Sequence, residues 1–336
     1  MNRLAEKIKK AFKDKRVAVI GDVVADQFLN GTISRVSREA PVFIIKHEET
    51  ETLPGGAANA AANVAALGGA PVLIGVIGND ENGRALLNAL VQKNVDDSQV
   101  LTAPGFSTTT KVRVIGGQPY STKKQVIRID YENRREIEKE MCGQLLAGLK
   151  NAAANAGAIV LSDYNYGVAF PELIETAKHI CQKRSIPLVV DSRFRLEQFT
   201  GATTATPNQE EVEQLLGKPF ETADCDALRR RLKFASLLIT LGGRGMVLAE
   251  NGKPPLAIPA VGSDQPLDVT GAGDTVIAAY ALGLAAGLNY AEAASVANHA
   301  GSIVVMKRGT AVAAIDELVE SLTEPVEDAS AAANEG

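Results

Sequence analysis

Strand-like and helix-like segments alternate along most of the chain, and this alternation limits its fold more than any other feature. Short apolar runs rich in Val, Ile and Leu are followed by segments whose apolar residues have helical spacing, which is typical of strand–helix units. The expected strands cover residues 16–21, 71–77, 158–161, 187–190, 203–206, 237–241 and 246–250. The expected helices cover residues 57–67, 81–93, 136–154, 171–184, 209–216, 274–286, 290–306 and 315–322. We therefore predict an α/β protein with three layers, in which a mostly parallel sheet has helices on both faces.

Two segments interrupt this alternation. Residues of about 28–49 and 108–130 are rich in β-branched residues and Arg, with no helical period, and this favours antiparallel strands outside the main sheet. An extension of the sheet edge would give the same pattern. We expect one domain over residues 1–323 and, because residues 324–336 are acidic and small, a disordered tail.

Composition excludes several classes of function. The net charge of −5 gives no support to binding of nucleic acid or anionic membranes, so an anionic substrate needs a local cluster of basic residues. No apolar run approaches the ~20 residues of a membrane span. Cys142, Cys181 and Cys225 are widely spaced and odd in number, which indicates reduced thiols. These features predict a cytoplasmic protein.

The sequence DVTGAGD at residues 268–274 runs directly into an apolar stretch of good helix formers. Glycines before a helix let the backbone approach a ligand, and the free N–H groups of the first turn attract an anion. Gly271, Ala272 and Gly273 would hold a phosphoryl group, while Asp274 takes a proton from an attacking hydroxyl. An acid that only satisfies the helix dipole would produce the same local pattern.

Acidic and small residues follow two other expected elements. Asp22 and Asp26 come after the first strand, where ligands of doubly wound sheets bind; they are candidate ligands of sugar hydroxyls or ordinary turn acids. Gly55 and Gly56 precede a helix whose first turn contains Asn59. A turn without side chains would let Asn59 face the same cleft.

Asn208 and Glu211 stand at the start of another expected helix. Their spacing is that of a capping box, which is the interpretation that these two residues favour when taken alone. The turn TLGGRG, with Thr240, Gly242 and Gly245, is neither a Walker A loop nor a Rossmann fingerprint.

Taken together, these motifs resemble those of the ribokinase-like (PfkB) carbohydrate kinases, which have D-[TV]-x-G-A-G-D, a double glycine before an Ala/Asn-rich helix, N-x-x-E and T-x-G-x-x-G. The resemblance implies a ribokinase-like fold, ATP and Mg²⁺ as cofactors, and Asp274 as the base. It places Asp22, Asp26, Gly55, Gly56, Asn59 and Asp163 at the sugar. It places Asn208, Glu211, Thr240, Gly242, Gly245 and Asn298 at the nucleotide, with Asn208 as a phosphate contact and Glu211 holding a water molecule of the Mg²⁺ ion. It also implies a K⁺ site at Asp268 and Thr270, as in some members of the family. It further implies that the segments at about 28–49 and 108–130 form a small β lid, which would close over the sugar and form a homodimer interface.

Several stretches resemble one branch, the D-glycero-β-D-manno-heptose 7-phosphate kinases. These are SRVSREAPV at residues 34–42, TKVRV at 110–114 and VIRID at 126–130. The chain departs from the branch at Arg38, where a Pro is usual, at NYG (165–167) in place of a Lys before Gly, and at DSR (191–193) in place of Asp-Pro-Lys. It has no H-x-G-H element, so we expect a kinase without a nucleotidyltransferase domain.

The resemblance predicts transfer of phosphate from ATP to the 1-position of a heptose 7-phosphate. Arginines of the lid support a phosphorylated acceptor, since a planar guanidinium suits phosphate: Arg35, Arg38, Arg113 and Arg128, with Arg193 at a nearby strand end. Three alternatives stay open: a kinase of an unphosphorylated sugar, a nucleoside kinase, and a regulator that binds a sugar without turning it over.

Overall fold

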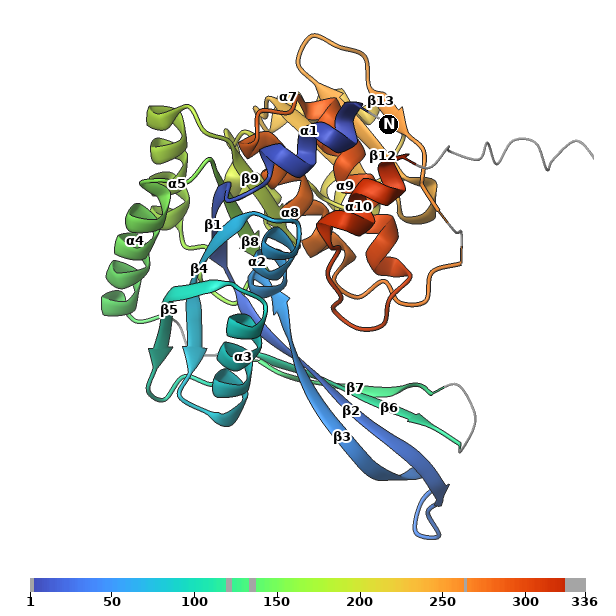
Figure 1. The fold of residues 1–336 in the computed structure, drawn as a ribbon. Helices are drawn as coiled ribbons and strands as arrows, with labels where there is room; N and C mark the ends of the chain where they lie inside the picture. Colours follow the sequence, from blue (N-terminus) through green and yellow to red (C-terminus); the bar gives the residue numbers. More distant parts are fainter. Residues whose placement is uncertain (1–2, 119–122, 133–136, 263–264, 324–336) are drawn as a thin grey trace, which may run out of the picture.

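Six parallel strands form the centre of the molecule, which is a computed structural model describing residues 3–118, 123–132, 137–262 and 265–323. The strands are β1 (Arg16–Gly21), β4 (Ala70–Gly78), β5 (Asp96–Ala103), β8 (Ala158–Asp163), β9 (Leu188–Ser192) and β10 (Thr204–Ala205). Their order in the sheet is β10-β9-β8-β1-β4-β5 (Figure 1). The carboxyl ends of β1 and β8 therefore lie side by side, with Gly21 opposite Ser162.

An antiparallel sheet continues this layer beyond β10. It consists of β11 (Ser236–Thr240), β12 (Met246–Glu250) and β13 (Leu256–Ile258). The backbone N–H of Thr240 donates to the carbonyl of Pro207 at 3.0 Å, so β11 runs beside the chain that leaves β10. The strands predicted at 237–241 and 246–250 are thus present as an antiparallel pair at the edge.

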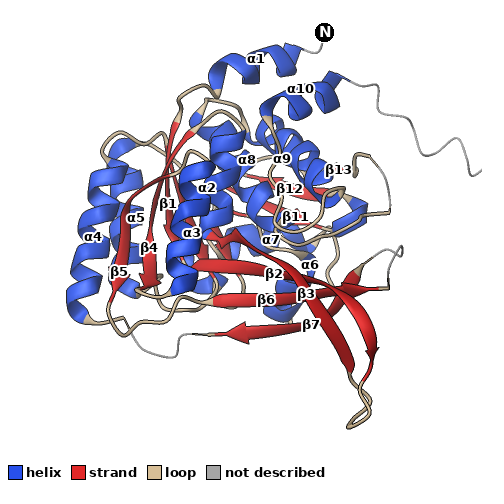
Figure 2. Ribbon diagram, turned by 60° about the horizontal axis from the view of Figure 1, so that its bottom comes forward, coloured by secondary structure: helices blue, strands red, loops and turns tan. Residues whose placement is uncertain are grey.

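Helices cover both faces of the sheet, as the alternation predicts (Figure 2). One face carries α1 (Arg3–Ala11), α2 (Ala57–Ala66), α3 (Glu81–Gln92), α8 (Ala272–Ala285), α9 (Tyr290–Val305) and α10 (Ile315–Thr323). The other carries α4 (Lys139–Ala153), α5 (Pro171–Arg184), α6 (Gln209–Leu216) and α7 (Asp224–Arg231). Side chains of a strand point alternately to opposite faces: Val17 and Val19 of β1 join the first core, and Ala18 and Ile20 join the second.

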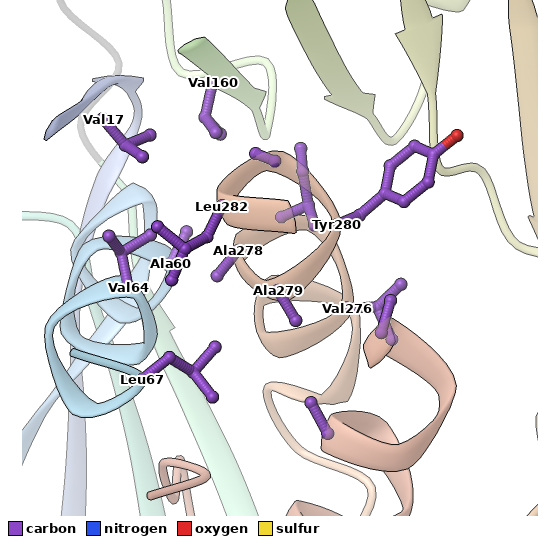
Figure 3. Close-up of a cluster of buried hydrophobic side chains, with 14 of the residues drawn as sticks. Val17, Ala60, Val64, Leu67, Val160, Val276, Ala278, Ala279, Tyr280 and Leu282 are labelled. Carbon is purple, nitrogen blue, oxygen red and sulfur yellow. The ribbon is translucent and has the colours of Figure 1, made fainter. Parts of the chain in front are cut away.

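The first core depends on small residues where α2 meets α8. Ala60 of α2 and Ala278 of α8 let the two helices approach closely, and Val64 and Leu282 fill the space between them (Figure 3). In this way the core brings the N-termini of two motif-bearing helices together.

A second sheet, the lid, projects from the body (Figure 1). It contains β2 (Val23–Val36), β3 (Phe43–Gly56), β6 (Thr110–Gly117) and β7 (Lys124–Tyr131), in the order β3-β2-β6-β7. Strand β2 begins two residues after β1 ends, and β3 leads directly into α2. The lid is therefore joined to the body at two connections, one that follows Gly21 and one at Gly55 and Gly56.

Two details of the sequence-based model were wrong or incomplete. The lid strands were all expected to be antiparallel, but β2 and β6 pair in parallel, because the chain crosses the body between them. The expectation also missed α1, α7, β5 and β13. The sequences of α7 and β5 are rich in polar residues, and β13 is only three residues long. The tail predicted at 324–336 lies outside the described residues. Among the residues that the structure does describe, no helix has the length and apolarity that a membrane span requires.

Candidate active site

Asp274 lies at the N-terminus of α8, in the first turn. Gly271 precedes the helix in a left-handed conformation, with φ of 77°, and a Cβ on it would lie 2.5 Å from the side-chain nitrogen of Asn59. Only glycine meets both conditions. The first N–H groups of an α-helix have no acceptor within the helix, so Gly273 and Asp274 present backbone donors to an anion here.

Two neutral donors fix the Asp274 carboxylate, which is only 3% exposed. The side-chain amide of Asn59 donates to one oxygen at 3.0 Å, and the hydroxyl of Tyr164 donates to the other at 2.9 Å. Burial raises the pKa of Asp274 to about 6, against the opposite effect of these two bonds. A carboxyl that changes charge near pH 6 is well suited to accept a proton.

Asn63 holds Asn59 in this position. Its amide donates to the side-chain oxygen of Asn59 at 3.1 Å, while its own oxygen accepts from the backbone N–H of Ala313 at 3.2 Å. The orientation of the Asn59 amide is thus determined, with its NH₂ directed to Asp274. Asn59 thus lies on the first turn of α2, and its side chain contacts Asp274.

The double glycine makes room for two acids of the β1–β2 segment. A Cβ on Gly55 would lie 2.4 Å from a carboxylate oxygen of Asp26, and one on Gly56, where φ is 57°, would lie 2.6 Å from the carbonyl oxygen of Asp22. Asp26 is buried and forms an ion pair with Arg113, which lies over the ring of Phe28 at 5.4 Å. Burial raises the pKa of Asp26, whereas Arg113 and Lys111 lower it.

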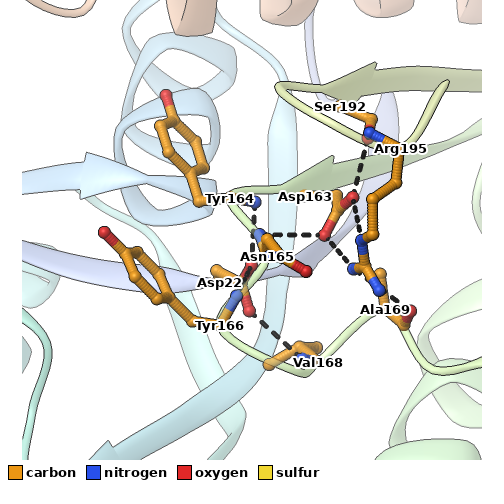
Figure 4. Close-up of polar contacts among 9 residues, drawn as sticks. All are labelled: Asp22, Asp163, Tyr164, Asn165, Tyr166, Val168, Ala169, Ser192 and Arg195. Atoms are coloured by element: carbon orange, nitrogen blue, oxygen red, sulfur yellow. Dashed lines mark hydrogen bonds and ion pairs between the residues drawn. The ribbon is translucent and has the colours of Figure 1, made fainter. Parts of the chain in front are cut away.

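Asp22 is occupied by backbone groups. Its carboxylate accepts the N–H groups of Tyr164, Tyr166 and Val168 at 2.8, 3.0 and 3.1 Å (Figure 4). Burial raises its pKa to about 6. These contacts give Asp22 the role of holding the loop after β8; its predicted contact with a sugar has no support in its surroundings.

Asp163 is likewise committed to its own loop. It accepts from the hydroxyl of Ser192 at 2.7 Å and from the backbone N–H of Asn165 at 3.1 Å, and it forms an ion pair with Arg195. Its carboxylate therefore holds the ends of β8 and β9 together, whereas we expected it at the sugar.

The arginines predicted at the acceptor differ in their availability. Arg113 is already paired with Asp26, and Arg35 and Arg38 are exposed at the outer end of the lid. Arg128 lies opposite Arg113 across the β6–β7 ladder and pairs with Asp130. Arg193 stands beside Phe194 and lines a cavity next to Asp191.

Sequence reasoning did not include Lys111 and Tyr164 among the site residues. Lys111 is 8% exposed, and its ammonium lies 5.1 Å from the centre of the Tyr164 ring. Burial lowers its pKa, while Asp26 raises it. The alternation of strand side chains was a usable signal for Lys111, because it puts residues 111 and 113 on one face of β6.

Two cavities meet beside Asp274. One, of about 210 Å³, is mostly apolar and lies between the TLGGRG turn and helices α8 and α9. The other, of about 290 Å³, contains acidic and basic side chains. Thr240 and Gly273 line both cavities, so an elongated ligand could extend from the apolar cavity to the helix N-terminus.

Residues predicted at the nucleotide surround these cavities. Thr240, Gly242, Gly245 and Asn298 line the apolar one. Gly245 has φ of 88°, and a Cβ there would lie 2.1 Å from the carbonyl oxygen of Ile258. The Asn298 amide donates to the carbonyl of Pro259 at 2.7 Å, which keeps its oxygen available to the cavity.

Asn208 and Glu211 form a reciprocal capping box, with both bonds at 2.9 Å. Both also line the polar cavity, so the capping and ligand-binding interpretations are compatible. Burial raises the pKa of Glu211 to about 7, and burial together with the charge of Glu211 raises that of Asp191 well above its usual range. A bound cation would relieve this repulsion.

The donor set suits magnesium better than a metal held by protein ligands alone. No group of three or more acidic, His or Cys side chains comes together within the described parts of the chain. Magnesium needs only one or two carboxylates when it also binds phosphates and keeps several waters. Thr206 adds a buried hydroxyl without a protein partner to the same cavity.

Asp268 and Thr270 are held in a tight turn. One Asp268 oxygen accepts the N–H of Thr270 and the other that of Gly309, both at 2.9 Å. These bonds fix the loop before α8, and they give each oxygen of the Asp268 carboxylate a donor without a cation.

The chain is similar in sequence to proteins named bifunctional protein HldE. The bifunctional protein HldE of Caulobacter vibrioides is 40% identical over 317 residues, covering 92% of this chain and 64% of that protein. HldE of Hahella chejuensis is 39% identical over 322 residues, covering 91% and 63%. The chain thus spans slightly less than two thirds of the length of these relatives.

Solved structures share the fold at low sequence identity. The structure of Arabidopsis thaliana ribokinase complexed with ribose and ATP superposes with a TM-score of 0.71, at 21% identity, covering 93% of this chain and all of that one. Escherichia coli phosphofructokinase-2 in complex with potassium gives a TM-score of 0.73 at 19% identity, covering 92% and 98%. These similarities confirm the predicted ribokinase-like fold.

The model of the pfkB family of carbohydrate kinases matches residues 14–317, almost the whole described chain. This match decides between the enzyme and the non-catalytic regulator that the sequence left open. The chain belongs to the pfkB family of carbohydrate kinases.

Proposed function

We propose that this carbohydrate kinase uses ATP and magnesium to phosphorylate D-glycero-β-D-manno-heptose 7-phosphate at its 1-position. The observation that supports it best is the placement of Asp274. This buried carboxylate stands between the lid face that carries Lys111 and Arg113 and the cavities beside α8. An acceptor on the lid side and a nucleotide on the other would meet at this residue.

In the proposed reaction Asp274 accepts the proton of the acceptor hydroxyl. The hydroxyl oxygen forms a bond to the γ-phosphorus of ATP, and the bond from that phosphorus to the bridging oxygen of ADP breaks. The N–H groups at the start of α8 stabilise the negative charge on the transferred group. Such catalysis depends mainly on positioning and charge.

Asn208, Glu211 and Asp191 would hold the magnesium–phosphate part of the nucleotide, and Asn298 the adenine end. The ion would neutralise phosphate charge. Burial raises the pKa values of both Glu211 and Asp191, and the charge of Glu211 raises that of Asp191 further, which supports this assignment. A monovalent cation at Asp268 and Thr270 has less support, because backbone N–H groups already satisfy Asp268.

Cationic side chains around Asp26 support a phosphorylated acceptor. Lys111 and Arg128 both act electrostatically on Asp26, and Arg193 acts on Lys111. Cationic side chains from the lid and from the end of β9 thus act on this region although the chain has a net charge of −5. The HldE relatives add to this, since they share about 40% identity over the kinase-like region. Arg193 keeps a positive charge where the heptose branch has Lys.

The proposal is tested by ADP release in a coupled assay. Free sugars, nucleosides and sugar phosphates, including heptose 7-phosphate, are compared at fixed ATP and magnesium. The highest kcat/KM is expected for heptose 7-phosphate. If ribose, fructose or a nucleoside is preferred instead, the enzyme is a ribokinase-like, fructokinase-like or nucleoside kinase, and the heptose assignment is wrong.

We further propose a homodimer formed through the lid and a cytoplasmic location. The lid has exposed apolar side chains on β7, among them Ile127, Ile129 and Tyr131, and contiguous apolar patches of this kind mark interfaces.

A further inference from the structure

We propose that Tyr164 is a positioning residue for Asp274, and that Asp22 keeps Tyr164 in place by binding the backbone of its loop. This inference deepens the proposed function, on which it rests through the role of Asp274 as base. It gives a role to Tyr164, a half-buried tyrosine outside the sequence motifs. It also gives a role to Asp22, a buried acid that no substrate group could reach without displacing backbone donors.

The first step is the shape of the loop after β8. Asn165 has φ of 65° and Gly167 has φ of 108°, so the chain turns twice into the left-handed region within three residues. These turns direct alternate N–H groups, those of Tyr164, Tyr166 and Val168, to the Asp22 carboxylate (Figure 4). A carboxylate that accepts three N–H groups acts as the centre around which the loop is folded.

The second step is the rigidity of the loop ends. Asp163 binds Ser192 and Arg195, which ties the end of β8 to the segment after β9 (Figure 4). Asp22 itself donates its backbone N–H to the carbonyl of Ser162 at 3.0 Å. Tyr164 therefore starts from a backbone that is fixed on both sides by β1, β8 and β9.

The third step is the placement of the Tyr164 side chain. Its ring lies against Gly56, where a Cβ would be 3.5 Å from Cε2, and under the Lys111 ammonium at 5.1 Å. Its hydroxyl donates to Asp274 at 2.9 Å. Burial and the charge of Asp274 raise the pKa of Tyr164 well above its usual range, so the hydroxyl stays a neutral donor.

The consequence concerns the orientation and basicity of Asp274. With Asn59 on one oxygen and Tyr164 on the other, the carboxylate cannot rotate, and its remaining lone pairs keep one direction. Each hydrogen bond also favours the charged form and lowers the pKa, by about one unit judged from carboxylates with several such bonds. Tyr164 thus keeps the base ionised near neutral pH despite its burial.

The test is the pH profile of kcat for Tyr164→Phe, which removes only the hydroxyl. The acid limb should move upward by about one pH unit, and kcat at pH 8 should fall about 10-fold through lost orientation, while KM for ATP is unchanged. Tyr166→Phe, on the same loop, is the matched control. It loses a bond to Glu132, which follows β7, and should leave the limb in place.

Charged groups that face Asp274 are Asp26 from β2, Lys111 from β6 and Asp191 from β9. They are retained in both tyrosine variants, so a difference between the two profiles reports the lost hydroxyl. An acid limb that coincides for Tyr164→Phe, Tyr166→Phe and the wild type would overturn the proposal.

The role of Asp22 is tested by Asp22→Asn and by the double variant with Tyr164→Phe. If Asp22 acts through Tyr164, its loss lowers kcat in the same way, and the double variant is little worse than either single variant. If Asp22 binds the sugar instead, KM for the acceptor rises and the two effects multiply. Loss of the acid limb in Asp22→Asn would show that Asp22, not Asp274, is the titrating group.

Failure of this inference differs from failure of the proposed function. Near-normal turnover of Asp274→Asn would show that Asp274 is not the base, and the proposed function would fail with it. Abolished turnover of Asp274→Asn with an unchanged Tyr164→Phe would remove only the positioning role.

Discussion

At the scale of single residues, the site balances burial against hydrogen bonds. Asp274 is surrounded by protein and would be costly to ionise, yet two neutral donors keep its pKa at about 6. A full positive charge at the same distance would hold the carboxylate ionised but reduce its affinity for a proton. Neutral Asn59 and Tyr164 therefore suit a base better than an arginine would.

Asp274→Asn should lower turnover by roughly 10²–10⁴-fold, the usual contribution of general-base catalysis. The fold and the ATP affinity should change little, because Asn fills the same volume at the start of α8. Steady-state kinetics and nucleotide binding of the purified variant measure both effects. A folded variant with near-normal turnover would contradict the role of Asp274.

The same substitution should stabilise the protein at pH 7. Folding raises the pKa of Asp274 from its ordinary 3.8 to about 6, so between these values the folded state binds more protons, and stability falls as the pH rises. At about 1.4 kcal/mol per pKa unit, the cost above pH 6 approaches ~3 kcal/mol. Urea unfolding should show Asp274→Asn more stable than wild type at pH 7 and not at pH 4. Equal stability at pH 7 would mean that burial of the charge is compensated elsewhere.

Glu211→Gln should raise the magnesium concentration needed for half-maximal rate. In the wild type this concentration should increase as the pH falls from 8 to 6, because a proton competes with the cation for a carboxylate whose pKa is about 7. The variant should lose that pH dependence. Glutamine also suits a capping box, so α6 should persist.

The matched control for this variant is Glu213→Gln, two residues further along the same helix. The Glu213 carboxylate accepts hydrogen bonds from the side chain of Gln209 and from the backbone N–H of Phe220. It should behave as wild type towards magnesium. If Glu211→Gln and Glu213→Gln respond identically, Glu211 is only a capping residue.

At the scale of elements, the lid joins the body through two short connections, and each contributes to the site. β1 passes into β2 at Asp22, and β3 passes into α2 at Gly56. Movement of the lid would therefore act directly on Asp26 and on the start of α2. The parallel pairing of β2 with β6 places Lys111 and Arg113 next to Asp26 and Phe28.

Arg128 is the more informative arginine for testing a phosphorylated acceptor. Arg113→Ala would leave Asp26 buried without its partner, which costs several kcal/mol, so its effects on binding and folding would be mixed. Arg128 is 47% exposed in its side chain. Arg128→Ala should raise KM for the sugar phosphate by about 10–100-fold, as for loss of a charged hydrogen bond, with KM for ATP unchanged.

Arg35→Ala is the control, since Arg35 is exposed at the far end of the lid. Its KM for the acceptor should equal that of wild type. If the enzyme prefers an unphosphorylated sugar and Arg128→Ala leaves KM for the acceptor unchanged, the enzyme is a plain sugar kinase.

At the scale of the whole molecule, the sequence predicted those parts of the site that local motifs encode. The start of α8, the double glycine and the capping box of α6 lie where the motifs indicated. The bond from Tyr164 to Asp274 joins residues 110 positions apart and depends on the left-handed turn at Asn165. No periodicity reports such a turn, because Asn occurs in many loop conformations.

The sequence also did not predict which polar side chains are buried or which partners they bind. Asp22, Asp163 and Arg113 have the residue types of ligand contacts, and each is instead held by a partner from another part of the chain. The parallel order of β2 and β6 likewise follows from how the chain crosses the body, which the strand pattern does not encode.

The lid leads to the last prediction, that the protein is a dimer in solution. Ile127, Ile129 and Tyr131 alternate on β7 and so share one face of the strand, with 53%, 41% and 57% of their surfaces exposed. Arg113 and Arg128 are cross-strand neighbours in the β6–β7 ladder, and their side chains lie on the opposite face. Apolar side chains on the face away from the acceptor are costly in water unless another surface covers them.

Ile127→Asp should therefore shift the protein from dimer to monomer in light scattering coupled to gel filtration, because a charge cannot be buried in an apolar interface without a partner. Lys124→Asp, at the end of the same strand, is the control for added negative charge. A wild-type protein that runs as a monomer at micromolar concentration, or a dimer unaffected by Ile127→Asp, would place any interface elsewhere. Since β7 also presents Arg128, monomers should retain ATP affinity but bind the acceptor less tightly.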